Sequence, residues 1–165
     1  AIRLQYAGDD ELTLLAVLNG SLVFLSDLMR RLPLRVRVEV AHVSSYPGGA
    51  TRSRGPRLTI PLPESLTGRH VLVVDDILDS GRTLDMLTAE IRSLGPRSLR
   101  TCVLVRKRRP DLPDRLEADF HGFDVPDEFV VGYGLDYDGL YRNLPDVCVL
   151  RPERYAAPGD ATEPI

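Results

Sequence analysis

Apolar runs of strand length alternate with helix-forming segments through the first two thirds of the chain, and this alternation constrains the fold most. The run 12–18, LTLLAVL, is continuously apolar, which is typical of a strand buried on both faces. The turn Asn19-Gly20 ends it, and residues 21–32 carry leucines at helical spacing. Because a strand that crosses through a helix to a parallel neighbour does so right-handedly, we predict an α/β fold with a mostly parallel central sheet flanked by helices.

Five further strands and one further helix follow from the same patterns. The strands are predicted at Arg35–Val43, Val71–Val74, Ser98–Val105, near Glu128–Tyr133 and at Val147–Leu150, and the helix at Arg82–Leu94, where Gly95-Pro96 ends it.

The chain length of 165 residues suits one domain. We place this single domain at residues 1–150 and expect residues 151–165 to be a loose tail. Residues 44–57, SSYPGGATRSRGPR, carry three Gly and two Pro without periodicity, which predicts a long flexible loop. Loops of this length in compact domains are often functional lids.

The composition excludes several classes of protein. A net charge of -3 argues against binding to bulk nucleic acid or to an anionic membrane. No apolar run reaches the ~20 residues that span a bilayer, and the first residues lack the pattern of a signal peptide. Cys102 and Cys148 each lie in an apolar, strand-like run, where we expect buried free thiols. These features predict a cytoplasmic protein with neither nucleic-acid nor membrane partners.

The segment 71–84, VLVVDDILDSGRTL, is the most informative stretch. An apolar strand brings Asp75 and Asp76 to its carboxyl end, where open α/β sheets bind ligands. The turn 79–83, DSGRT, then opens a helix, so its amides, its two hydroxyls and the helix dipole suit a phosphate monoester. Carboxylates beside such a cradle suit sugar hydroxyls or Mg²⁺, and together the two features indicate a sugar phosphate.

Other interpretations of this segment are a P-loop, an EF-hand loop, a receiver domain and a merely structural strand–turn–helix. The GxxxxGK[ST] spacing of a P-loop and the alternating oxygen ligands of an EF-hand are missing. A receiver domain needs a lysine later in the chain, and none follows Lys107. The structural interpretation stays open on the pattern alone.

The segment 71–84 resembles the phosphoribosyl-pyrophosphate signature of the type I phosphoribosyltransferases. The segment 122–145, GFDVPDEFVVGYGLDYDGLYRNLP, is similar to the purine-binding segment of hypoxanthine-guanine phosphoribosyltransferases. The turn LNGS at 18–21, the SSY at 44–46 and the strand before Lys107 fall in matching order, so the resemblance covers roughly residues 12–150. It implies the type I phosphoribosyltransferase fold with a flexible hood loop.

The resemblance implies a purine salvage enzyme that transfers the phosphoribosyl group of phosphoribosyl pyrophosphate to hypoxanthine, guanine or both. The products would be IMP or GMP and pyrophosphate. Two alternatives remain: an enzyme that prefers xanthine, and a non-catalytic regulatory protein of the same fold that senses phosphoribosyl pyrophosphate or nucleotides. The resemblance further implies Mg²⁺ as cofactor and assembly as a homodimer or homotetramer.

Residue roles follow from the same resemblance. Asp79 is the candidate catalytic acid/base, and Asp75, Asp76 and Asp136 are the candidate ligands of Mg²⁺. The residues implied for phosphoribosyl pyrophosphate are Leu18, Asn19, Gly20, Asp75, Asp76, Asp79, Ser80, Gly81, Arg82, Thr83 and Arg142. Those implied for the purine are Lys107, Phe129, Val130 and Asp136, and those implied for the hood loop are Ser45 and Tyr46.

From pattern alone, Phe129 and Val130 also fit a core strand, and Asp136 also fits a turn. Two positions depart from the family pattern. Asn19 stands where the family often has Lys or Arg at a cis peptide, and Asp75 stands where close relatives usually have Glu.

Lys107 is the one lysine among 21 basic residues. The resemblance places it against the 6-oxo group of the purine, where a compact ammonium donates to a single oxygen better than a planar guanidinium does. Its arginine neighbours are interpreted as a solvated strand end.

Overall fold

The computed structural model describes residues 1–6, 8, 11–44, 55–108 and 117–154. A six-stranded sheet in the order β3-β2-β1-β4-β5-β6 forms its centre, and all neighbours pair in parallel except β2 and β3. The predicted mostly parallel α/β fold is confirmed. The strands of this sheet are β1 (Glu11–Leu18), β2 (Arg35–Ser44), β3 (Arg57–Leu58), β4 (His70–Leu78), β5 (Ser98–Lys107) and β6 (Phe120–Val125). The helices are α1 (Ile2–Gln5), α2 (Leu22–Arg31) and α3 (Arg82–Ser93), with short 3-10 turns at Glu64–Leu66 and Pro152–Arg154.

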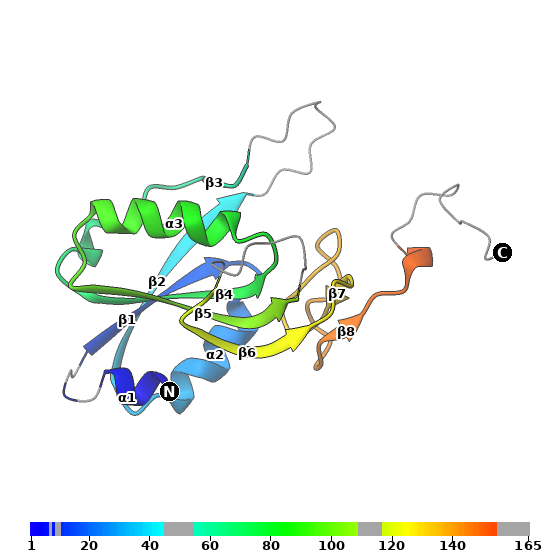
Figure 1. Cartoon of the computed structure of the whole chain (residues 1–165), viewed down its shortest axis with the longest axis horizontal. Coiled ribbons are helices and arrows are strands. Elements are labelled where there is room, and N and C mark those ends of the chain that lie inside the picture. The colour runs from blue at the N-terminus through cyan, green and yellow to red at the C-terminus, as the bar shows by residue number, and fades with distance from the viewer. Residues whose placement is uncertain (7, 9–10, 45–54, 109–116, 155–165) are drawn as a thin grey trace.

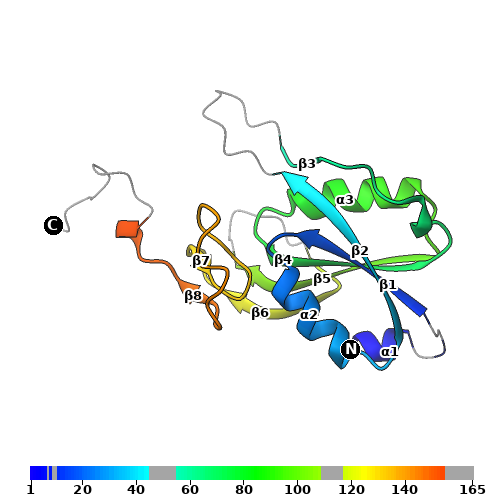
Figure 2. The same cartoon turned by 180° about the vertical axis from the view of Figure 1, so that it is seen from behind.

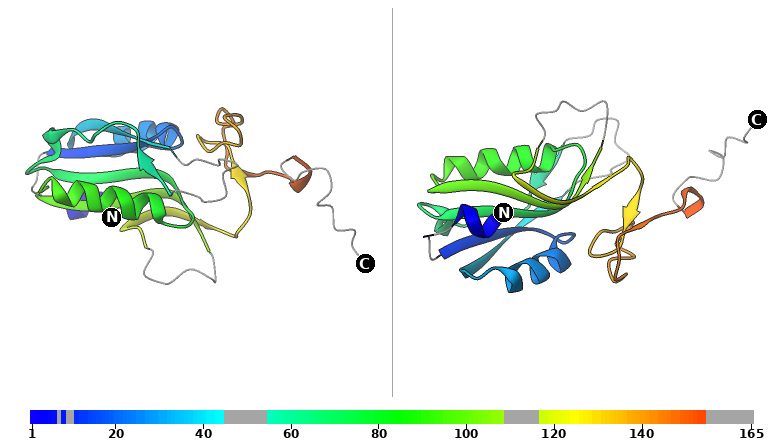
Figure 3. Two further views of the ribbon diagram at one scale, coloured as in Figure 1. Left: turned by 90° about the horizontal axis from the view of Figure 1, so that it is seen from above. Right: turned by 60° about the horizontal axis from the view of Figure 1, so that its bottom comes forward.

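Helices cover both faces of the sheet (Figure 3). Because successive side chains of a strand point to opposite faces, Leu14 and Ala16 of β1 pack in the cluster that contains Leu25 of α2. Leu15 lies in the other cluster, with Leu87 of α3. The apolar run of β1 is therefore buried on both faces, as its sequence predicts.

The parallel strands all end on one side of the molecule, and a small second sheet lies beyond that edge (Figures 1 and 2). It consists of β7 (Val130–Val131) and β8 (Cys148–Val149), which pair antiparallel. The strands predicted near 128–133 and 147–150 thus exist but are shorter than predicted. They form a separate sheet that faces the carboxyl ends of β1, β4 and β5.

Several features differ from the sequence-based expectations. The edge strand β6 was not predicted, because its exposed residues include Gly122 and lack an apolar alternation. Cys102 is buried as expected and burial raises the pKa of its thiol to about 12, but Cys148 is exposed on the short strand β8. The strand that carries the two acids is also longer than predicted, since β4 continues to Leu78.

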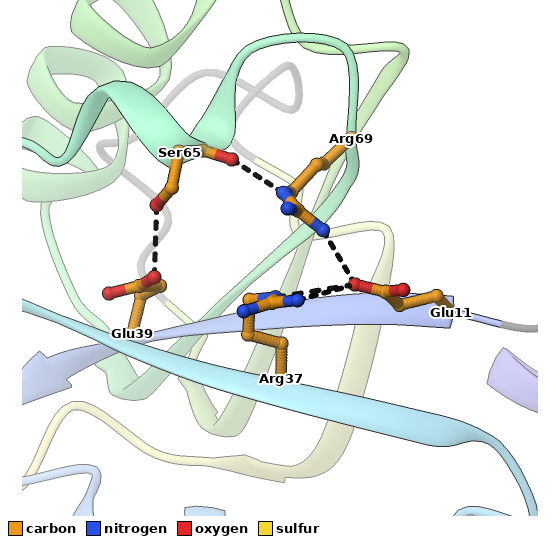
Figure 4. A network of polar contacts seen from close by, with 5 residues as sticks. All are labelled: Glu11, Arg37, Glu39, Ser65 and Arg69. Atoms are coloured by element: carbon orange, nitrogen blue, oxygen red, sulfur yellow. Dashed lines mark hydrogen bonds and ion pairs between the residues drawn. The ribbon is translucent and has the colours of Figure 1, made fainter.

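A polar network joins the strands at the amino edge of the sheet, opposite the second sheet (Figure 4). Glu11 at the start of β1 accepts hydrogen bonds from Arg37 at 3.2 Å and from Arg69 at 2.5 Å. Ser65 donates to Glu39 at 2.9 Å, and its carbonyl accepts from Arg69 at 2.6 Å. The hydrogen bond from Arg37 is the main reason that the pKa of Glu11 is lowered. Polar contacts therefore hold this edge of the sheet together.

Several predicted features lie outside the described residues. They are the hood residues Ser45 and Tyr46 and residues 155–165 of the tail. The predicted loop 44–57 is described only at its ends, where Ser44 closes β2 and Arg57 opens β3. In the described part of the chain, no helix combines the length and apolar character needed to cross a membrane.

Candidate active site

The turn after β1 packs directly against the acids of β4. The Leu18–Asn19 peptide is cis, as the family resemblance implies. Gly20 is buried, and a Cβ built on it would lie 1.6 Å from Oδ2 of Asp76. On its other side, a Cβ on Gly134 would lie 2.1 Å from the carbonyl oxygen of Gly20. The turn is therefore held between Asp76 and the segment that follows β7, and only glycine fits at its centre.

Asp75 and Asp76 are neighbouring carboxylates near the end of β4, and Asp75 is buried whereas Asp76 is half-buried. Asp75 accepts from the amide of Asp76 at 3.0 Å, and Asp76 accepts from the amide of Ile77 at 3.0 Å. Burial, and then the charge of Asp76, raises the pKa of Asp75 well above its ordinary value. Burial also raises the pKa of Asp76, although Arg142 opposes this. A cation or hydroxyl donors at this position would therefore stabilise the charged form of both carboxylates.

The turn that follows β4 opens α3 as predicted. Gly81 occupies the position before the first helical residue with φ 74°, a left-handed conformation that favours glycine. Its carbonyl oxygen accepts from the amide of Asp85 at 2.9 Å. Ser80 is exposed, Thr83 is half-buried and Gly81 is buried, so this turn presents the hydroxyls of Ser80 and Thr83 at the helix amino terminus. This arrangement suits an oxyanion.

A cavity of about 180 Å³ lies beside the acids and the phosphate-type turn. It is lined by Asp76, Ile77, Asp79, Lys107, Phe129, Val130, Leu135 and Asp136. Phe129 meets the ring of Tyr137 edge-on, with centroids 5.5 Å apart and ring planes at 89°. The cavity thus combines an aromatic ring, apolar walls and charged groups, which is the make-up of a small-molecule site.

Lys107 lies between two carboxylates at the end of β5. Its Nζ is 3.4 Å from Oδ2 of Asp79 and 3.5 Å from Oδ1 of Asp127, and its side chain is only 11% exposed. The interpretation of the neighbouring arginines as solvated is wrong for Arg106, whose side chain is 13% exposed and donates to Asp124 at 2.7 Å. Arg108 is exposed as expected.

Arg142 and Asp136 form an ion pair within the segment after β7. Nη2 of Arg142 is 2.6 Å from Oδ1 of Asp136, and Nη1 donates to the carbonyl oxygen of Gly134 at 2.6 Å. The other oxygen of Asp136 accepts from the amide of Gly139 at 2.7 Å. Among the described residues, no three His, Cys, Asp or Glu side chains are grouped so that they could hold a metal ion. Asp136 and the pair Asp75 and Asp76 therefore lie at one site without forming one ligand cluster.

The segment after β7 is also tied to α2. The hydroxyl of Tyr133 donates a short hydrogen bond to Asp27, which also pairs with Arg30. Tyr133 itself has φ 52°. These bonds lower the pKa of Asp27, the contact with Tyr133 being the largest cause. Because α2 begins directly after the turn at Gly20, the turn 18–20 and the segment that follows β7 are both attached to this helix.

The structure brings several of the residues that the sequence suggested to one cavity, and it adds four residues to the site. Asp79, Lys107, Phe129, Val130 and Asp136 all line one cavity. The additions are Ile77, Leu135, Asp127 and Gly134. Asp127 lies in the loop between β6 and β7, where the motif Val-Pro-Asp-Glu indicates an ordinary turn. No local pattern pairs it with a lysine twenty residues away.

Comparisons with known proteins relate the chain to phosphoribosyltransferases. Residues 1–138 match the family model of the phosphoribosyl transferase domain. Hypoxanthine-guanine phosphoribosyltransferase of Mycobacterium tuberculosis is 45% identical over 147 residues, covering 88% of this chain and 71% of the relative. Hypoxanthine phosphoribosyltransferase of Trypanosoma cruzi in complex with its product IMP is 41% identical with a TM-score of 0.81, covering 93% of this chain and 86% of the other. The hypoxanthine-guanine phosphoribosyltransferase structure of Bacillus anthracis is 36% identical with a TM-score of 0.81, covering 91% and 87%.

Proposed function

The chain belongs to the phosphoribosyl transferase domain family, among the hypoxanthine-guanine phosphoribosyltransferases, and on this premise we propose that it transfers phosphoribosyl from phosphoribosyl pyrophosphate to hypoxanthine, guanine or both. One observation carries the proposal: a single cavity is lined by the ammonium of Lys107, the carboxylate of Asp79 and the ring of Phe129. These groups match an oxo group, a ring N–H and a flat aromatic base, respectively.

The purine binds in that cavity. Phe129 stacks against the base, and main-chain groups at Val130 meet its pairing edge. The ammonium of Lys107 donates to the 6-oxo oxygen. An adenine would present an amino group there, and a donor facing a donor disfavours it. The apolar walls at Ile77 and Leu135 shield these contacts from water, which strengthens them.

Transfer then exchanges one bond at the sugar. A ring nitrogen of the purine attacks the anomeric carbon, and the electron pair of the breaking C–O bond leaves on pyrophosphate. The proton of the purine imidazole passes to the carboxylate of Asp79. The carboxylate of Asp79 lies 3.4 Å from the ammonium of Lys107. The sugar passes through an oxocarbenium-like state, which the nearby anionic groups stabilise.

Phosphoribosyl pyrophosphate is held along the carboxyl edge of the sheet. The amides and hydroxyls of residues 79–83 receive the 5′-phosphate, and Asp75 and Asp76 meet the ribose hydroxyls. Amides of the turn 18–20 and the guanidinium of Arg142 receive the pyrophosphate. Asn19 is exposed and uncharged, so Arg142 supplies the side-chain charge on this side. Arg142 must release the carboxylate of Asp136 when it binds the pyrophosphate, because the carboxylate and the pyrophosphate compete for the same guanidinium.

Mg²⁺ suits the carboxylates of this site. Asp75 and Asp76 have raised pKa values that a cation would lower again, and Asp136 lies beside the pyrophosphate position. The described residues hold no cluster of three ligands, which fits an ion that keeps water and substrate oxygens in its shell. When bound, Mg²⁺ would neutralise charge on the diphosphate leaving group.

Partners and location complete the proposal. We expect a homodimer or homotetramer, which is supported by large exposed apolar side chains at Leu22, Phe123 and Val149. A cytoplasmic location is supported by Cys102, a buried free thiol. A xanthine-preferring enzyme and a non-catalytic sensor remain as the two alternatives.

The test is a spectrophotometric assay with phosphoribosyl pyrophosphate and MgCl2, run in parallel on hypoxanthine, guanine, xanthine and adenine. We expect nucleotide formation with hypoxanthine, guanine or both, and none with adenine. Turnover of xanthine alone would establish the xanthine-preferring alternative. Binding of phosphoribosyl pyrophosphate without product from any purine would establish the sensor instead.

A further inference from the structure

We propose that Asp127 is a positioning residue that holds the ammonium of Lys107 in line with the 6-oxo group of the purine. The inference rests on the proposed function and extends it to a residue outside the purine contacts described above. Asp127 does not line the purine cavity, so it acts through Lys107 rather than on the substrate.

The geometry leaves one donor of Lys107 for the substrate. An ammonium has three N–H groups, and Nζ stands 3.4 Å from Asp79 and 3.5 Å from Asp127. The side chain of Lys107 is nearly covered, at 11% exposure, whereas the side chains of Asp79 and Asp127 are 41% and 48% exposed. Two of the three N–H groups suffice for the two ion pairs, which leaves the third for the purine oxygen.

Asp127 is held by the loop that connects β6 and β7. Pro126 fixes the backbone before Asp127. The amide of Glu128, which follows Asp127, donates to the carbonyl oxygen of Pro126 at 2.8 Å. The side chain of Asp127 is 48% exposed, so its ion pair with Lys107 is partly screened by solvent. We therefore assign it to orientation of the ammonium rather than to stability of the fold.

The reaction explains why one carboxylate is insufficient. Asp79 takes up the proton of the purine imidazole, and from that moment it no longer carries a negative charge. A lysine held by Asp79 alone would lose its anionic partner as the bond to the sugar forms. Asp127 is not part of the proton transfer, so it keeps Lys107 in place through that step.

The first test is kinetic and compares Asp127→Asn with Glu128→Gln, a matched control that removes the same charge from the exposed neighbouring residue. Asp127→Asn should raise the KM for hypoxanthine about tenfold and leave the KM for phosphoribosyl pyrophosphate within about twofold, as expected for a weakened charge-assisted contact. Glu128→Gln should resemble the unaltered protein. Asp127→Glu, which restores the charge, should recover part of the loss.

Two further arms separate positioning from a structural role. Purine without a 6-substituent has no oxygen for Lys107, so its KM should not respond to Asp127→Asn. In a Lys107→Met background, Asp127→Asn should change the KM for hypoxanthine little. Equal effects on hypoxanthine and unsubstituted purine, or full persistence of the effect in the Lys107→Met background, would overturn the proposal.

A second measurement does not depend on turnover. Because Lys107 is the only lysine, selective ¹³C labelling at lysine Cε gives one NMR resonance that reports its surroundings. Asp127→Asn should shift this resonance and Glu128→Gln should not. If no purine is turned over, the proposed function fails while the resonance still decides whether Asp127 holds Lys107. An unshifted resonance in Asp127→Asn would be sufficient to refute the positioning role of Asp127.

Discussion

Adding a methyl group at Gly20 should disrupt the geometry of the site. The φ of Gly20 is not in the left-handed region, so alanine meets no backbone strain, but the new Cβ would lie 1.6 Å from Oδ2 and 2.3 Å from Cγ of Asp76. Ordinary contact begins at 3.4 Å, so the turn and the carboxylate must separate by about 2 Å. A misplacement of ~1 Å can lower the rate a hundredfold, and we expect Gly20→Ala to lower kcat/KM for phosphoribosyl pyrophosphate at least ~100-fold.

The fold itself should survive this change. Overpacking a buried position typically costs ~1–3 kcal/mol, which leaves a domain of ordinary stability folded. Gly122→Ala is the matched control, because its Cβ would lie 2.6 Å from the carbonyl oxygen of Leu104, also outside the left-handed region and away from the acids. It should lower the free energy of unfolding comparably and leave kcat/KM of the folded protein nearly unchanged.

The assay measures initial rates of nucleotide formation at a temperature where circular dichroism shows both variants to be folded. Urea unfolding adds a double-mutant test, since Gly20→Ala should destabilise far less in an Asp76→Ala background, where the clashing carboxylate is absent. If Gly20→Ala keeps kcat/KM within about threefold of the unaltered protein, or destabilises equally in both backgrounds, the close packing of the turn on Asp76 is not what organises the site.

Two other predictions concern base choice and pH. Lys107→Arg should lower kcat/KM for hypoxanthine ~10- to 100-fold with little change in melting temperature, because a guanidinium is bulkier and prefers two acceptors; unchanged kinetics would mean that the lysine is there by chance. Asp124 has a pKa lowered to about 2 from 3.8, chiefly by its hydrogen bond from Arg106, so its stabilising effect is complete above pH ~4 and is lost as the pH falls toward ~2. Thermal melts should show Asp124→Asn less stable than the unaltered protein near pH 6, with the difference shrinking below pH ~4; a constant difference would contradict the ion pair.

Local sequence pattern determined the elements whose structure depends on residues that are neighbours in the sequence. The run 12–18 is buried on both faces because every residue in it is apolar or small, and α3 opens at Arg82 because Gly81 permits the turn. The long resemblance in 122–145 similarly pointed to Phe129 and Asp136, although their side-chain patterns alone fit a core strand and a turn.

Tertiary structure decided everything that depends on segments far apart in the chain. The edge strand β6 is exposed and has no pattern of its own, so only pairing with β5 makes it a strand. Gly20 is a turn residue by sequence, and its need for glycine comes from Asp76 lying against it. Lys107 gains its surroundings from Asp79 and Asp127, which reach it from two different loops. Sequence patterns record which face of an element is apolar, but contacts between side chains are set only when the sheet brings its strand ends together.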